Sequence, residues 1–149
     1  MSLSRAKRIE YYKGAAAFWH EAILLQGQRC LEAQADADTI RVDLNFYVVS
    51  VQRLREVAVQ IRDRLRQDSI RPALERFDTR WPRFKELRNS EEHILGPSGH
   101  YPLGIWYFRH AVVDLQPYGK VEYIVHLEAM ESSINELFIA IREALAEPL

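Results

Sequence analysis

The residues best suited to chemistry lie in the segment 88–93, which reads RNSEEH: Arg88 is followed directly by Asn89 and, further along, by His93. Histidine titrates near neutral pH and can move a proton, and a guanidinium can neutralise charge that develops on a phosphate. The amide of Asn89 can hydrogen-bond one ring nitrogen of His93 and fix the orientation of the ring. These residue types suit RNA cleavage without a metal ion, in which a 2′-hydroxyl attacks the adjacent phosphate.

The segment is predicted to lie on a helix. Apolar residues recur at helical spacing around it, at Phe84, Leu87, Ile94 and Leu95. On a helix Asn89 and His93 share a face, whereas Arg88 and His93 point about 140° apart. A long arginine side chain or a second copy of the helix is therefore needed to bring guanidinium and imidazole together.

This arrangement resembles the R-x4-6-H signature of HEPN domains, helical modules in which a polar residue usually follows the arginine. The resemblance covers the six motif residues and the helical setting. It implies that Arg88 and His93 form a catalytic pair, with Asn89 as the polar companion, in a metal-independent endoribonuclease of the toxin or defence type. It also implies a homodimer that places two motifs beside one cleft, RNA as substrate, and an antitoxin partner by analogy with the family.

A noncatalytic interpretation of the same segment stays open. Glu91 and Glu92 place two carboxylates beside the proposed phosphate site, and they repel a phosphate. Arg88 can pair with Glu92 one turn away, and His93 can lie near the last carbonyls of its helix. The chain is then a homodimerising interaction module whose polar segment only stabilises a helix.

Other chemistry is weakly indicated. No H-E-x-x-H, P-loop, dinucleotide glycine fingerprint or G-x-S-x-G motif occurs, so we expect no cofactor and no metal site. Isolated histidines such as His20 and His126 are expected to be structural. Cys30 is the single cysteine and is predicted to be a small buried side chain, because no basic cluster surrounds it in sequence.

A third interpretation is a small-molecule binder. Gly96 to Gly104 is the one dense stretch of glycine and proline and is predicted to be a loop. The aromatic run 106–108 (WYF), with His100 and Tyr101 nearby, can line a ligand pocket or stack on bases. The alternative is an aromatic hairpin that packs over the helices.

Composition favours an ordinary globular chain. With 149 residues, 48% hydrophobic and 28% charged, residues 1–149 are expected to form a single domain. No apolar run is long enough to span a bilayer and no signal-peptide core is present, so we expect a cytoplasmic protein without membrane contact.

The charges are distributed unevenly along the chain. From Arg53 to Arg88 there are 11 basic and 6 acidic residues, and from Asn89 onward 3 basic and 9 acidic. The basic part can meet a phosphate backbone, or the two parts can pair within the fold.

The elements that must position these residues are mainly helical. Amphipathic spacing predicts helices over Ser4–Gln34, over a heptad seam from Leu44 to Leu65, and from Ile70 to Trp81, where Pro82 ends the third. A last helix is marked by an apolar stripe and by a capping box from Ser133 to Glu136.

Between the motif and the last helix, two segments rich in β-branched and aromatic residues flank a turn with proline and glycine. They predict a β-hairpin of strands Ile105–Leu115 and Lys120–Leu127. The expected fold is therefore mainly α, an up-and-down bundle of four to five helices with a β-hairpin before the C-terminal helix.

Overall fold

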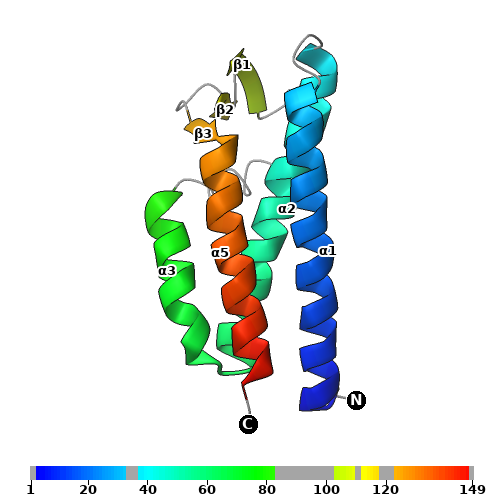
Figure 1. Ribbon diagram of the computed structural model, residues 1–149, viewed down its shortest axis with the longest axis vertical. Helices are drawn as coiled ribbons and strands as arrows, with labels where there is room; N and C mark the ends of the chain where they lie inside the picture. Colours follow the sequence, from blue (N-terminus) through cyan, green and yellow to red (C-terminus); the bar gives the residue numbers. More distant parts are fainter. Residues whose placement is uncertain (1–2, 33–36, 83–102, 110–111, 118–122, 148–149) are drawn as a thin grey trace, which may run out of the picture.

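The computed structural model describes residues 3–32, 37–82, 103–109, 112–117 and 123–147. Four α-helices packed together form its core: α1 (Arg5–Glu32), α2 (Ala37–Arg64), α3 (Arg71–Arg80) and α5 (Leu127–Ala146). Successive helices run in opposite directions, and the described chain ends at the same end of the bundle where it begins (Figure 1). The helical-bundle part of the predicted fold is confirmed.

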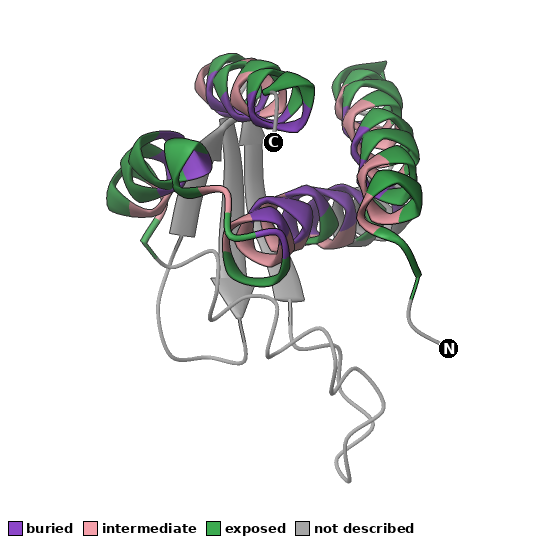
Figure 2. Ribbon diagram, turned by 90° about the horizontal axis from the view of Figure 1, so that it is seen from below, coloured by how far each residue is buried: buried purple, intermediate pink, exposed green. Residues whose placement is uncertain are grey.

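Helix α2 supplies the centre of the core. The heptad positions whose side chains are described are all buried, namely Tyr47, Val51, Leu54, Ala58, Ile61 and Leu65. Burial of each large apolar side chain contributes about 1.5–3 kcal/mol, so this seam is a main source of stability. Figure 2 shows the buried positions of α2, α3 and α5 turned toward the interior of the bundle.

Helix α1 packs mainly on α2 and also contacts α5. Its buried residues are Tyr12, Ala16, Ile23 and Cys30, which recur every four or seven positions and so lie on one face. Ile9 and Trp19 are partly buried against the same core. The predicted first helix and its apolar stripe are confirmed.

A tight connection joins α2 to α3. Arg66 has a φ of 56°, in the left-handed region, and the backbone N–H of Gln67 donates to the carbonyl of Ile61 at 3.3 Å. These features reverse the chain after α2. The side-chain amide of Gln67 also donates to the carbonyl of Ala144 at 3.1 Å, which ties this connection to the last turn of α5. A short 3₁₀ helix, η1 (Asp68–Ile70), then leads into α3.

Helix α3 buries Ala73, Leu74 and Phe77, as the predicted stripe requires. It ends at Arg80, where the backbone N–H of Trp81 donates to the carbonyl of Phe77 at 2.9 Å. Pro82 follows at once, so the predicted end of this helix is confirmed.

The predicted start of the last helix is wrong. Helix α5 begins at Leu127, directly after a strand, and Ser133 is a buried residue in its interior instead of an N-cap. Apolar residues on both sides of Ser133 continue one face of the helix: Leu127, Met130, Ile134, Leu137, Ile141 and Leu145. Burial of this longer stripe outweighs the local capping preference of serine.

The strands form a three-stranded antiparallel sheet in the order β1-β2-β3, with bounds β1 (Leu103–Arg109), β2 (Val112–Pro117) and β3 (Tyr123–His126). The segment Ile105–Leu115, predicted as one strand, is divided between β1 and β2. The pairing of β1 with β2 shifts register between Ile105 and Tyr107. Leu103 and Gly104, predicted to be loop residues, belong to β1.

Candidate functional site

The predicted catalytic residues lie outside the described residues. The structure describes the chain to Pro82 and again from Leu103, so Arg88, Asn89 and His93, with the predicted helix that carries them, fall in between. Their arrangement and their pairing across a dimer stay predictions. The site that the described residues do build lies elsewhere, within the helical bundle.

A cavity of about 320 Å³ lies between α1, α2 and α5. It is placed at the end of the bundle where α1 ends and α5 begins, which is also the end that carries the strands (Figure 1). Its lining combines aliphatic residues with a few polar ones. The lining residues are Ile23, Leu24, Gly27, Gln28, Leu31, Tyr47, Leu127, Glu128 and Glu131. This volume is at the small end of the range for ligand pockets.

Tyr47 is the buried polar group of this cavity. Its side chain comes from the heptad seam of α2 and is only 2% exposed, and its hydroxyl is buried without a hydrogen-bond partner among the described residues. Burial raises the pKa of Tyr47 far above its ordinary value, and the nearby Cys30 and Glu131 raise it further. The phenol therefore stays protonated, so that it can both donate and accept a hydrogen bond.

Gly27 allows the Tyr47 ring to lie against α1. A Cβ atom at position 27 would stand 3.3 Å from Cε2 of the Tyr47 ring, closer than side chains normally approach. Any larger residue at this position must displace the ring. Gly27 and Tyr47 therefore lie in close contact where both line the cavity.

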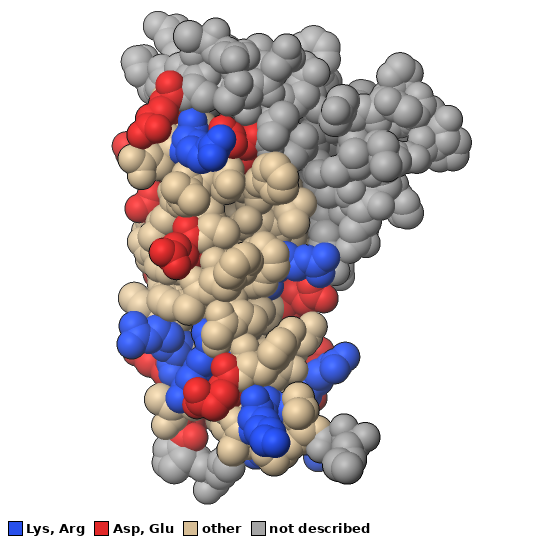
Figure 3. Space-filling view, turned by 90° about the vertical axis from the view of Figure 1, so that its right-hand side faces the viewer, with Lys and Arg blue, Asp and Glu red and all other residues tan. Residues whose placement is uncertain are grey.

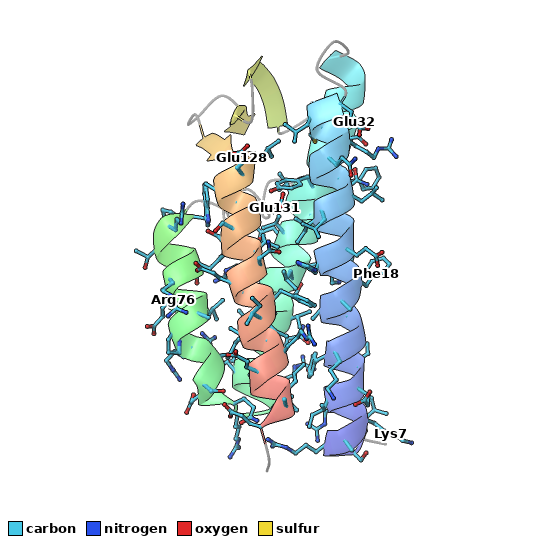
Figure 4. All side chains as sticks on the ribbon, in the orientation of Figure 1. Lys7, Phe18, Glu32, Arg76, Glu128 and Glu131 are labelled. Atoms are coloured by element: carbon cyan, nitrogen blue, oxygen red, sulfur yellow. The ribbon has the colours of Figure 1, made fainter. Side chains whose placement is uncertain are left out.

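Two carboxylates stand at the rim. Glu128 and Glu131 lie on the first turns of α5 and are exposed (Figure 4). Gln28, on the opposite wall, donates its side-chain amide to Glu32 at 3.0 Å. None of the described lining residues is basic, so the cavity has a negative rim.

Cys30 is buried on α1, as the sequence predicts. Burial raises the pKa of its thiol to about 12, and the charge of Asp43 acts in the same direction, against an opposing effect of Arg29. Asp43 is itself buried and pairs with Arg29 at 3.1 Å. Cys30 is thus a neutral thiol at physiological pH and not a nucleophile.

His20 contacts two residues of α5. Its Nε2 lies 2.8 Å from Oδ1 of Asn135, and its ring stacks on Phe138 with centroids 4.0 Å apart. These contacts join α1 to α5. Among the described residues, no group of three or more His, Cys, Asp and Glu side chains is placed to hold a metal ion.

Four arginines of α2 and α3 form ion pairs with acidic residues between positions 53 and 88. Arg55 makes a bidentate pair with Asp78 at 2.6 and 2.8 Å, joining the two helices. Further pairs join Arg53 to Glu56, Arg62 to Asp63 and Arg71 to Asp68. These pairs neutralise part of the basic segment locally.

The outer face of α1 carries large apolar side chains. Tyr11, Phe18 and Leu25 are 64%, 62% and 55% exposed and are spaced by seven residues, so they form one stripe along the helix. Gly14 lies between the first two, and a Cβ there would meet no atom within 4 Å. Figure 3 shows a mostly uncharged surface over the middle of this side of the molecule.

The sequence did not reveal the cavity, because its lining residues fit other patterns or lie outside the predicted helices. Tyr47 fits the heptad seam of α2, so its pattern predicts only a core residue. Glu128 and Glu131 precede Ser133, where the last helix was predicted to begin. Only the correct start at Leu127 places them beside the end of α1.

Comparison of this chain with protein-family models, with curated proteins and with solved structures finds no match. In the part of the chain that the structure describes, no helix is both long and apolar enough to cross a membrane.

Proposed function

We propose that this chain is a HEPN-like helical protein that binds RNA and cleaves it without a metal ion. The observation that carries the proposal is the segment 88–93, in which an arginine, a polar amide and a histidine stand at the spacing of the R-x4-6-H signature. The antiparallel four-helix core supports it, because HEPN-like motifs belong to helical bundles. The three strands before the last helix are an addition to that pattern.

The proposed roles follow from chemistry. His93 transfers the proton of the attacking 2′-hydroxyl, Arg88 stabilises charge on the phosphate, and Asn89 orients the imidazole. A homodimer brings two motif helices together, because Arg88 and His93 of one helix point in different directions. An antitoxin that covers this cleft is the partner that the family analogy suggests.

RNA degradation and growth on expression test this proposal. The wild type is expected to degrade RNA in the presence of a chelator and to slow growth. Arg88→Ala and His93→Ala are expected to lose about 10²-fold or more of this activity. Arg83→Ala and His100→Ala are matched controls, since they remove the same residue types outside the motif. Intact RNA with wild-type protein, or full activity in His93→Ala, contradicts the proposal.

A second candidate is a noncatalytic homodimerising interaction module. The exposed stripe of Tyr11, Phe18 and Leu25 on α1 favours it, because three large apolar side chains in one line are a typical helix-docking surface. This function needs no activity of the segment 88–93. Loss of self-association in Phe18→Glu, together with intact RNA in all variants, supports this candidate over the nuclease.

A further inference from the structure

We propose that a groove between α3 and α5 binds a phosphate group. The two helices contact each other and run in opposite directions (Figure 1). The α3–α5 groove has a volume of about 280 Å³ and is lined by Ala73, Arg76, Phe77, Arg80, Ser133 and Glu136. Two guanidinium groups and one hydroxyl donate to the phosphate oxygens. None of these residues belongs to the segment 88–93, so the inference does not depend on RNA cleavage.

The first argument is the hydroxyl of Ser133, a residue that is only 5% exposed on α5. Ser50 is a buried serine as well, and it donates its hydroxyl to the carbonyl of Phe46 at 2.7 Å. Ser133 makes no such hydrogen bond within the described part of the chain. The fully enclosed polar atoms that lack a partner do not include its Oγ, so this oxygen keeps accessible surface in the groove that Ser133 lines. A buried hydroxyl normally has a partner, and a ligand in the groove supplies one.

The second argument is a pair of arginines without an acidic partner. Arg76 and Arg80 are four residues apart on α3, so they share one face of the helix, where like charges repel each other. Neither forms an ion pair with a described carboxylate, whereas Arg71 on the same helix pairs with Asp68 at 2.9 Å. Arg80 also lies over the ring of Trp81, 5.7 Å from its centroid, a contact that does not use its N–H groups. An anion that binds both guanidinium groups removes their repulsion.

Glu136 is the one carboxylate among the lining residues. It forms no ion pair with Arg76 or Arg80 in the structure as described. Two guanidinium groups and one carboxylate leave a net charge of +1 on the lining, which attracts an anion. The carboxylate itself repels a phosphate, so its removal is expected to strengthen binding.

Phosphate suits this set of donors better than a carboxylate ligand does. A phosphate group presents three strong acceptor oxygens, and a guanidinium binds two of them side by side. Two guanidinium groups and a hydroxyl from facing helices can therefore bind different oxygens of one group. The volume of about 280 Å³ is just below the usual range of ligand pockets. The groove therefore holds one compact group, and the molecule that carries it extends outside.

Titration of the full chain with inorganic phosphate tests the proposal, with acetate as the comparison anion at the same ionic strength. Amide NMR spectra are expected to show a saturable shift at Ser133 and Arg76 with phosphate. Acetate is expected to bind at least about 3-fold more weakly, because it offers fewer oxygens. Equal binding of the two anions overturns the proposal, as does the absence of a saturable shift with phosphate.

Substitutions test the individual contacts. Arg76→Gln and Ser133→Ala are each expected to weaken phosphate binding about 2- to 10-fold, and Glu136→Gln to strengthen it about 2- to 5-fold. Arg71→Gln is the matched control, because Arg71 lies on the same helix and does not line the groove. It is expected to bind phosphate as the wild type does. Unchanged affinity in Arg76→Gln, or an equal loss in Arg71→Gln, overturns the proposal.

Folding and binding are separable in Ser133→Ala. The substitution removes a hydroxyl that has no described partner and places alanine, the best helix former, inside α5. Its melting temperature is therefore expected to equal or exceed that of the wild type, while its phosphate affinity falls. A folded Ser133→Ala that binds phosphate as tightly as the wild type overturns the assignment of the hydroxyl.

RNA binding distinguishes the two sources of such a phosphate, an RNA strand and a small phosphorylated molecule. Single-stranded RNA is titrated into His93→Ala, which is expected not to cleave it, with and without Arg76→Gln. If the phosphate belongs to RNA, Arg76→Gln is expected to lower RNA affinity and to reduce its logarithmic salt slope by about 0.7. If it belongs to a small molecule, Arg76→Gln is expected to change only the binding of inorganic phosphate. The phosphate titration needs no cleavage, so a failure of the nuclease proposal leaves its result valid.

Discussion

At the scale of single residues, the described bundle holds protonated groups where the sequence suggests only apolar packing. Tyr47 and Cys30 lie in the core next to each other, and burial raises the pKa of both. Each keeps its proton because its charged form would be far from water. Burial therefore sets the protonation state of both groups.

Cys30 is expected to make stability depend on alkaline pH. The pKa of its thiol is about 12 in the folded chain and close to 9.0 when unfolded. Between these values the unfolded chain loses this proton while the folded chain keeps it. The stabilisation is therefore complete below pH 9 and declines above it, by at most about 1.4 kcal/mol per pH unit.

Chemical denaturation at pH 8.5, 9.5 and 10 measures this effect. Cys30→Ala is the comparison, because it lacks the titrating group although its cavity lowers stability at every pH. The free energy of unfolding is expected to fall more steeply with pH in the wild type than in Cys30→Ala. Parallel curves for the two proteins would show that Cys30 titrates normally.

At the scale of elements, most helices could be predicted because burial and periodicity agree within each of them. The heptad seam of α2 and the stripes of α1 and α3 are long enough to outweigh local irregularities such as Gly14. Local signals alone failed where long-range packing decides. Ser133 resembles a cap but is buried inside α5, because the apolar face of that helix begins at Leu127.

Candidate sites likewise differ in whether a local pattern can reveal them. Residue types and spacing suffice to nominate Arg88, Asn89 and His93 as a constellation. The cavity can be recognised only when three helices are placed together, because its lining comes from residues 23–31, from Tyr47 and from residues 127–131. No sequence window contains all three parts, so no local pattern could reveal it.

The ion pair between Arg55 and Asp78 is expected to hold α3 against α2. Arg55 is 14% exposed in its side chain and makes two hydrogen bonds to the carboxylate of Asp78. Arg55→Ala is expected to lower the free energy of unfolding by about 1–2 kcal/mol, because it removes both bonds and the packing of the arginine stem.

Denaturant titration measures this loss, with Arg62→Ala as a matched control. Arg62 pairs only with its sequence neighbour Asp63 among the ion pairs described, so that pair joins no two helices. Its removal is expected to change stability by less than about 0.5 kcal/mol. Equal losses in the two variants would mean that the Arg55–Asp78 pair stabilises the fold no more than the exposed pair of Arg62 does.

At the scale of the whole molecule, α1 lies at one side of the described bundle. It contacts α2 and α5 on its inner face and presents Tyr11, Phe18 and Leu25 outward. The stripe covers about 21 Å of helix at 1.5 Å per residue, and the open position at Gly14 lets another backbone approach closely. A second copy of α1, antiparallel across a twofold axis at Phe18, would place Tyr11 opposite the partner's Leu25.

Self-association through this stripe is the last prediction. The wild type is expected to be a dimer by light scattering, and Phe18→Glu a monomer, because the twofold axis would bring two carboxylates together in an apolar contact. Phe18 is exposed, so the variant is expected to keep its fold, which circular dichroism checks. Ile139→Glu is the matched control, since Ile139 is a 54% exposed residue on α5 and does not belong to the stripe of α1. A monomeric wild type, or a Phe18→Glu dimer as stable as the wild type, rules out this surface. A Phe18→Glu monomer that still cleaves RNA would separate this interface from any interface that assembles the motif helices.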